Sequence, residues 1–128
     1  MHNLAALITL LALLLYLVMT ARVGMARGKF GIVAPAIAGH PEFERHFRVQ
    51  ANTGEWLLLF LPLLWLFSIY VSDVVAAGLG IIWLIGRALY MVGYVKAADK
   101  RSAGFGLQGL ATLALLLGAL GGVVMKLI

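Results

Sequence analysis

Cysteine is absent from the 128 residues of this chain, and charged residues make up only 12% of it. Without cysteine, the protein has no disulfide framework, no zinc–thiolate site and no thiol nucleophile of its own. A soluble domain is about one quarter charged and about half apolar, whereas 63% of these residues are hydrophobic. This balance excludes an ordinary soluble domain and a disordered chain. Any chemistry has to come from other side chains or from a ligand.

Acidic residues are also scarce, with five of them against ten lysines and arginines, which gives a net charge of +5. That excess would suggest nucleic acid in a soluble protein, but in so apolar a chain it indicates biased loops or an anionic ligand. The three histidines lack metal-ligand spacing, and the sequence has no P-loop, GxGxxG motif or Ser-His-Asp arrangement. We therefore expect neither a nucleic-acid partner nor a metal site.

Four long apolar runs account for most of the chain. Because a transmembrane helix needs roughly 20 apolar residues, four spans with short connections leave no room for a separate soluble domain. We predict a single all-α domain over residues 1–128, folded as an integral membrane four-helix bundle. Its helices are expected at about residues 3–22, 42–71, 74–98 and 104–127. The polar segment from Arg22 to Pro41, which contains several glycines, is expected to be a loop.

Basic residues are concentrated on one side of this topology. The first and third connections with their flanking turns hold Arg22, Arg27, Lys29, Arg45, Arg48, Lys96, Lys100 and Arg101. The other side holds little beyond His2, Asp73 and Lys126. Since positive charge marks the cytoplasmic side, we expect both of these loops in the cytoplasm and both termini on the opposite side. The membrane would be a bacterial inner membrane or the endoplasmic reticulum.

The second span carries polar residues on one face. Arg48, Asn52 and Glu55 are spaced i, i+4 and i+7, so they share one side of a helix. Glu55 lies roughly 10 Å deeper than Arg48, and the apolar run begins directly after it. A carboxylate at that depth is costly unless it is paired or lines a wet cavity.

The third span repeats the pattern with Arg87, Tyr90 and Tyr94, spaced i, i+3 and i+7. If the two faces meet, they form a cavity that also includes Arg101 from the following loop. One alternative is a buried Glu55–Arg87 ion pair that only fixes the register of the helices. For the two tyrosines alone, an interfacial aromatic belt is an equally good explanation.

The predicted cavity has more hydrogen-bond donors than acceptors, so it suits a small, flexible anion with one ammonium group. Arginine side chains bind carboxylates with two parallel hydrogen bonds. Glu55 can receive an ammonium group, Asn52 can bond a peptide group, and the tyrosines can cover an apolar or sulfur-bearing part. A peptide such as glutathione fits this description.

The same residues carry a family resemblance. The pattern E-R-x-x-R-x-Q/H-x-N-x-x-E is present from Glu44 to Glu55, with six fixed residues over twelve positions. It is followed by Arg87-x-x-Tyr90-x-x-x-Tyr94 in the third span. With the chain length, the four spans and the loop between Pro35 and Pro41, these motifs resemble the membrane-associated proteins in eicosanoid and glutathione metabolism over essentially the whole chain.

This resemblance implies a homotrimer of left-handed, up-down four-helix subunits, with glutathione bound at subunit interfaces near the cytoplasmic face. It implies that Arg101 activates the glutathione sulfur, with Lys100 as the alternative if the register differs by one residue. It also implies that Arg27 reaches the ligand from a neighbouring subunit. The other ligand-binding positions that it implies are Arg48, Gln50, Asn52, Glu55, Trp56, Arg87, Tyr90 and Tyr94.

Two departures from the family pattern bear on activity. Trp56 stands where leukotriene-forming members have tyrosine, and Gly28 replaces a second basic residue. Both argue against leukotriene synthesis. The resemblance favours a glutathione transferase of detoxification that acts on lipophilic electrophiles or lipids from the bilayer, with glutathione as co-substrate and with a peroxidase activity as an option. The thiolate would then be the ligand's, which is consistent with a cysteine-free protein.

Two other functions are compatible with parts of the sequence. One is a non-catalytic, lipid-binding member of the same family, although the chain retains the polar residues that would bind a ligand. The other is a small multidrug transporter of similar length with four spans. Such exporters couple to protons through a carboxylate that normally lies in the first span, whereas residues 4–20 carry no charge at all.

Overall fold

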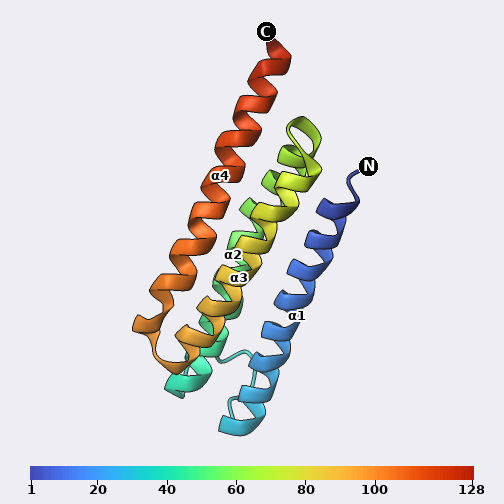
Figure 1. The fold of residues 1–128 in the computed structure, drawn as a ribbon. Helices are drawn as coiled ribbons and strands as arrows, with labels where there is room; N and C mark the ends of the chain where they lie inside the picture. Colours follow the sequence, from blue (N-terminus) through green and yellow to red (C-terminus); the bar gives the residue numbers. More distant parts are fainter.

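The computed structural model describes all residues 1–128 and contains helices but no β-strand. In chain order the elements are α1 (Asn3–Phe30), α2 (Pro41–Tyr70), α3 (Asp73–Lys96), the short 3-10 helix η1 (Ala98–Arg101) and α4 (Ser102–Leu127). By length and composition, four helices can cross a membrane. The α1–α2 and α3–α4 connections lie at one end of the bundle, and both chain termini and the α2–α3 turn lie toward the other (Figure 1).

Local sequence signals set the ends of the helices. Pro41 occupies the first turn of α2, and the His40 ring accepts a hydrogen bond from the Glu42 N–H at 3.1 Å. At the start of α3, the Ser72 hydroxyl accepts from the Val75 N–H at 3.2 Å. Both are N-terminal caps that satisfy backbone donors left free by the helix geometry. They fix where each helix enters the bundle.

Helix α1 is longer than the sequence analysis predicts. The expectation of a helix ending near residue 22 is wrong, because α1 continues to Phe30 and ends at Gly31, which has φ +66°. Gly24 and Gly28 lie inside the helix, and Gly31 is the residue that adopts the left-handed conformation which ends it. The ends of the other three long helices lie within two residues of the predicted bounds.

The core is aromatic and aliphatic at the centre of the bundle. The Phe60 ring of α2 stacks on the Trp83 ring of α3 with centroids 4.0 Å apart, and both side chains are fully buried. The outer surface is also apolar. Along α1, Leu10, Leu14 and Leu17 are more than half exposed. Apolar side chains on the outside as well as the inside are what a lipid environment favours.

Helices α3 and α4 approach each other closely at two glycines. A Cβ atom placed on Gly86 would lie 2.7 Å from the backbone nitrogen of Gln108, and one on Gly104 would overlap the α3 backbone at Tyr90. Small residues at such a crossing let membrane helices pack backbone to backbone. This contact holds the start of α4 against the last turns of α3, where the candidate site lies.

Candidate functional site

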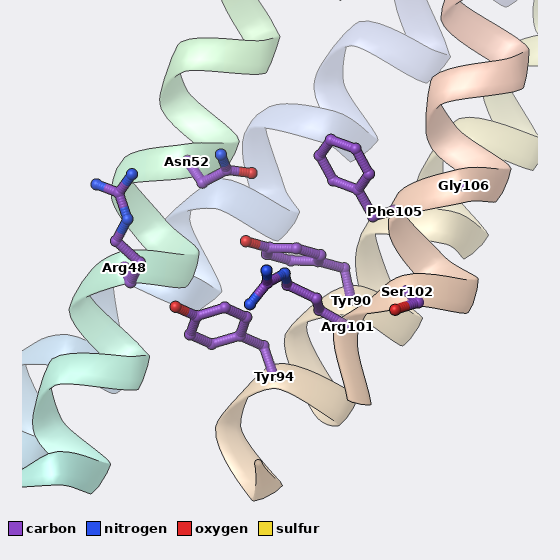
Figure 2. A pocket seen from close by; sticks show the side chains of 8 residues that line it. All are labelled: Arg48, Asn52, Tyr90, Tyr94, Arg101, Ser102, Phe105 and Gly106. Atoms are coloured by element: carbon purple, nitrogen blue, oxygen red, sulfur yellow. The ribbon is translucent and has the colours of Figure 1, made fainter. Parts of the chain in front are cut away.

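A cavity of about 540 Å³ opens at the end of the bundle that carries the two longer connections. Figure 2 shows side chains from α2, α3, η1 and α4 around it. Its lining residues are Arg48, Asn52, Tyr90, Tyr94, Arg101, Ser102, Phe105 and Gly106. The lining therefore contains two guanidinium groups and no carboxylate. Its volume lies in the range typical of small-molecule sites, roughly 300–1,000 Å³.

Helix α2 contributes Arg48 and Asn52, which lie one turn apart and both line the cavity. In Figure 2 the Asn52 amide points toward the tyrosines, whereas the Arg48 side chain extends along the outer side of α2. Glu55 lies one turn further along, in an adjoining groove of about 250 Å³ that also includes Arg48, Asn52 and Trp56. The Glu55 side chain is exposed, and no cation of its own chain pairs with it. The predicted polar face of α2 therefore borders two spaces. Arg48 and Asn52 line both the cavity and the groove, whereas Glu55 lines only the groove.

Helix α3 contributes a pair of stacked tyrosines. The rings of Tyr90 and Tyr94 lie 5.4 Å apart, and Tyr90 is only 3% exposed. Tyr90 also packs at 6.1 Å against the ring of Phe105 from α4. Tyr90 is therefore buried inside the bundle, which does not fit an aromatic belt facing lipid, and the half-buried Tyr94 lines the same cavity.

Arg101 reaches the cavity because η1 turns the chain sharply between α3 and α4. Its Nη1 donates to the Ala98 carbonyl at 3.0 Å, and the guanidinium lies 5.8 Å from the centroid of the Tyr94 ring. In Figure 2 the guanidinium lies next to the two tyrosine rings and extends toward α2. Lys100 is exposed and does not line the cavity. Of the two basic neighbours, the structure places Arg101 at the site.

Arg87 does not line the cavity, contrary to the prediction. It is fully buried behind the cavity wall, where Nη2 donates to Asn52 Oδ1 at 3.1 Å and to the Thr53 hydroxyl at 2.5 Å. Its guanidinium also lies 4.1 Å from the centroid of the Tyr90 ring. Arg87 therefore supports two residues of the wall from behind. Because it occupies Asn52 Oδ1, the Asn52 NH₂ group is left free to donate.

The alternative of a buried Glu55–Arg87 ion pair is wrong for this chain. The ion pair that the chain does form joins Lys29 to Glu42 at its surface. The reason is helical geometry, because two residues along a helix differ by about 200° in direction. Thr53 points into the bundle toward Arg87, so Glu55 points away from it.

Arg27 and Gln50 lie outside the cavity of their own chain. Gln50 Nε2 donates to the Thr20 hydroxyl of α1 at 3.1 Å. Arg27 Nη1 donates to the Ala36 carbonyl at 2.7 Å, and its guanidinium lies 4.9 Å from the centroid of the Phe43 ring. Both residues are on the side of α2 that meets α1, whereas the cavity is on the side that meets α3 and α4.

Sequence reasoning missed the contribution of α4 to the cavity. Ser102, Phe105 and Gly106 follow Arg101 at one, four and five positions, which is the spacing of one helix face. A helix starting directly after Arg101 would have revealed this face, but the predicted fourth helix starts two residues later. Phe105 also contacts Trp56 edge to face at 5.6 Å, so it links the cavity to the groove that holds Glu55.

Comparison of the sequence with known proteins finds one matching family and several similar proteins. The model of the MAPEG family matches residues 5–121. An uncharacterized protein of Synechocystis sp. is 52% identical over 122 residues, which cover 95% of this chain and 89% of that protein. Microsomal glutathione S-transferase 2 of Homo sapiens is 46% identical over 78% of this chain and 69% of its own length. Leukotriene C4 synthase of Bos taurus is 39% identical, with coverage of 78% and 67% respectively.

Proposed function

This chain belongs to the MAPEG family, and from that premise we propose that it is a glutathione transferase embedded in the membrane. Its helices and its family make it an integral, multi-pass membrane protein. The reaction would join glutathione to lipophilic electrophiles that dissolve in the bilayer, as in detoxification. The observation that carries this proposal is the convergence of Arg48 and Arg101 on one cavity whose lining has no carboxylate.

Glutathione matches the polar groups of the cavity and its adjoining groove. The peptide has two carboxylates, which guanidinium groups such as that of Arg48 bind with parallel hydrogen bonds. It has one ammonium group, for which Glu55 offers an unpaired carboxylate. The free NH₂ group of Asn52 can donate to a peptide carbonyl. These assignments place the backbone of the tripeptide along α2 and its thiol toward η1.

Arg101 would supply the activation step. A guanidinium beside the sulfur stabilises the thiolate relative to the thiol, which lowers the pKa of the glutathione thiol and raises the fraction of nucleophile at neutral pH. The thiol proton leaves to water. Tyr94, whose ring lies beside the Arg101 guanidinium, borders the same space. Both residues would act on the reacting end of glutathione, whereas Arg48 and Glu55 hold the other parts.

The electrophile would enter along the apolar side of the site. Trp56 and Leu59 line the adjoining groove, and Phe105 lies between this groove and the cavity. With an aryl chloride, the thiolate forms a carbon–sulfur bond and chloride leaves with its bonding electrons. With a lipid hydroperoxide, two glutathione molecules would give the alcohol, water and glutathione disulfide.

We propose a homotrimer of up-down, left-handed bundles that completes this site. Glu55 is exposed at a depth where an uncompensated carboxylate is costly, so a partner surface or a ligand has to cover it. Arg27 and Gln50 lie on the other side of α2, where they would face the cavity of a neighbouring copy. The excess of basic residues at the loop end supports a cytoplasmic location for that end.

The test is turnover by purified protein with glutathione and 1-chloro-2,4-dinitrobenzene, together with calorimetric titration of glutathione. We expect both binding and conjugation. Binding without conjugation of this or any other electrophile would favour the non-catalytic lipid-binding relative. Absence of glutathione binding in a folded, monodisperse preparation would contradict the transferase and leave a transporter as the alternative.

A further inference from the structure

A second, smaller cavity lies where the end of α1 meets the start of α2. It has a volume of about 220 Å³ and shares no residue with the candidate active site. Its lining includes Arg22, Met25, Lys29, Phe30, Glu42 and His46. Three of these residues are basic types and one is acidic. The cavity is at the end of the bundle with the two longer connections, toward which α1 descends in Figure 1.

The charges in this cavity are only partly compensated. Lys29 Nζ lies 3.4 Å from Glu42 Oε2, and this pair is solvent-accessible. Arg22 has no hydrogen bond or ion pair within the chain, and neither has the His46 ring. Arg22 is half-buried and lines the cavity. Of the charged lining residues, Lys29 and Glu42 offset each other and the positive charge of Arg22 is left uncompensated.

The depth of the cavity identifies the kind of anion. Arg22 directly follows the apolar run that ends at Ala21, so it lies at the boundary of the hydrocarbon layer. Lys29 is seven residues further along the same face of α1, roughly 10 Å outward. The polar headgroup layer is about 5–8 Å thick on each side of a bilayer, so the cavity spans it. Met25, at 68% exposure, places an apolar surface beside the charge.

We propose that this cavity binds the phosphate of an anionic phospholipid, with Arg22 and His46 donating to it and Met25 contacting the apolar part of the lipid. Basic pockets between membrane helices at the headgroup level are suited to such lipids. Glu42 would repel a phosphate, but its pairing with Lys29 offsets this charge. Arg27 takes no part, because it is bonded to the Ala36 carbonyl. The proposal is independent of the glutathione site.

The experiment is native mass spectrometry of the protein from nanodiscs that contain equal amounts of phosphatidylglycerol and phosphatidylcholine. We expect the wild-type protein to retain phosphatidylglycerol in preference to phosphatidylcholine. Arg22→Gln should lower that preference about fivefold, the effect of removing one cation at a membrane surface. Lys126→Gln, which removes the same charge at the other end of the bundle, is the matched control and should leave the preference unchanged.

Three results would overturn the proposal. They are equal retention of both lipids by the wild type, an equal loss of preference in the Lys126 control, and displacement of the lipid by millimolar inorganic phosphate, which would indicate a site for a soluble anion. A helical circular dichroism spectrum and a monodisperse elution profile equal to those of the wild type show that Arg22→Gln is folded. If it does not reconstitute, His46→Gln removes a donor from the same cavity and should also reduce the preference, and an undiminished preference there would contradict the proposal.

Discussion

Two polar clusters lie at opposite ends of the bundle, and they differ in whether their polar groups find partners in the chain. At the end with the termini, the Asp73 carboxylate accepts from the backbone N–H groups of Leu4 and Ala5, both at 3.0 Å, and from the Ser68 hydroxyl at 2.7 Å. Ser68 Oγ also lies 2.8 Å from His2 Nδ1. This network is satisfied internally and joins the start of α1 to α2 and α3.

The polar cluster at the loop end, around the candidate site, contains charged side chains that have no such partners. Arg48 and Glu55 border open space and have no partner within the chain. Both side chains are exposed and border the cavity or the groove beside it, so their charged groups are free to contact a ligand. The two clusters contain similar types of polar side chain, and the difference between them is that Arg48 and Glu55 have no partner in the chain whereas Asp73 has three.

The satisfied cluster illustrates this point because His2, Ser68 and Asp73 are the residue types of a hydrolase triad. In such a triad the histidine lies between serine and carboxylate and takes the serine proton. Here the serine lies in the middle, and its hydroxyl donates to Asp73. The serine proton is therefore held by the carboxylate, and no base is placed to remove it. The cluster caps helix ends instead of forming a nucleophile.

The largest effect on activity is expected from Arg101→Ala, in the cluster at the loop end. Loss of the guanidinium should lower kcat about a hundredfold, the size seen when a charge-stabilising donor is removed, and should raise the pKa of bound glutathione. Glutathione affinity should fall only a few-fold, because Arg48, Asn52 and Glu55 remain. The measurement is a pH titration of thiolate absorbance combined with steady-state kinetics.

Lys100→Ala is the matched control for that experiment, since Lys100 is adjacent but does not line the cavity. Its thiolate pKa should equal that of the wild type. The same pKa in the wild type and in both variants would rule out activation by arginine. A shift in the lysine variant alone would assign the role to the neighbouring residue.

A smaller effect is expected from Glu55→Gln. Its carboxylate has no partner in the chain, so the substitution should leave folding intact while glutathione affinity weakens about tenfold, or about 1.4 kcal/mol. Calorimetry on the folded protein measures this change. Unchanged affinity would remove Glu55 from the role of ammonium anchor and would weaken the contrast between the two clusters.

Asp73→Ala, in the cluster at the end with the termini, is expected to lower stability without changing glutathione affinity. The substitution removes three accepted hydrogen bonds and a favourable charge at the start of α1, so the melting temperature should fall by several degrees with glutathione affinity unchanged. Thermal unfolding in detergent measures the first quantity and calorimetry the second. Asp99→Ala, an exposed residue in η1 without a bonded partner, controls for the loss of one negative charge. A loss of glutathione affinity in Asp73→Ala would show that the two ends are coupled.

The smallest effect is expected from His2→Ala. The ring makes one hydrogen bond, to Ser68, and lies 6.3 Å from the Trp65 ring. Because Asp73 keeps all of its own bonds, the melting temperature should fall less than in Asp73→Ala. If His2→Ala lowers it as much, the histidine is an essential part of the network and the hierarchy within this cluster is wrong.

The sequence predicts the spans well because each apolar run is long enough to be recognised by composition alone. Because helical spacing within one span is regular, it also predicts that Arg48 shares a face with Asn52 and that Tyr90 shares a face with Tyr94, and the structure brings both pairs to one cavity. The sequence does not predict the end of α1, because polar and glycine residues can continue a helix once it is formed. Only the left-handed Gly31 ends it.

The partner of Arg87 could not be predicted for a different reason. Spacing within a helix shows which residues share a face, but not how one helix is rotated about its axis relative to the next. Whether Arg87 meets Thr53 or Glu55 depends on the rotation of α2 relative to α3, the two helices that also meet through the stacking of Phe60 on Trp83. The place of Phe105 in the cavity lining could not be predicted either, because it depends on the residue at which α4 begins.

The glycine contact between α3 and α4 has a consequence for mutational robustness. Gly104 lies three residues after Arg101 and packs against the α3 backbone at Tyr90, so main-chain contact fixes the position of Arg101 relative to the two tyrosines. The lipid-facing leucines of α1 take no part in that alignment. The outer surface can therefore change with the thickness and composition of the host membrane without disturbing the reactive geometry, whereas a single methyl group added at Gly104 would push the two helices apart.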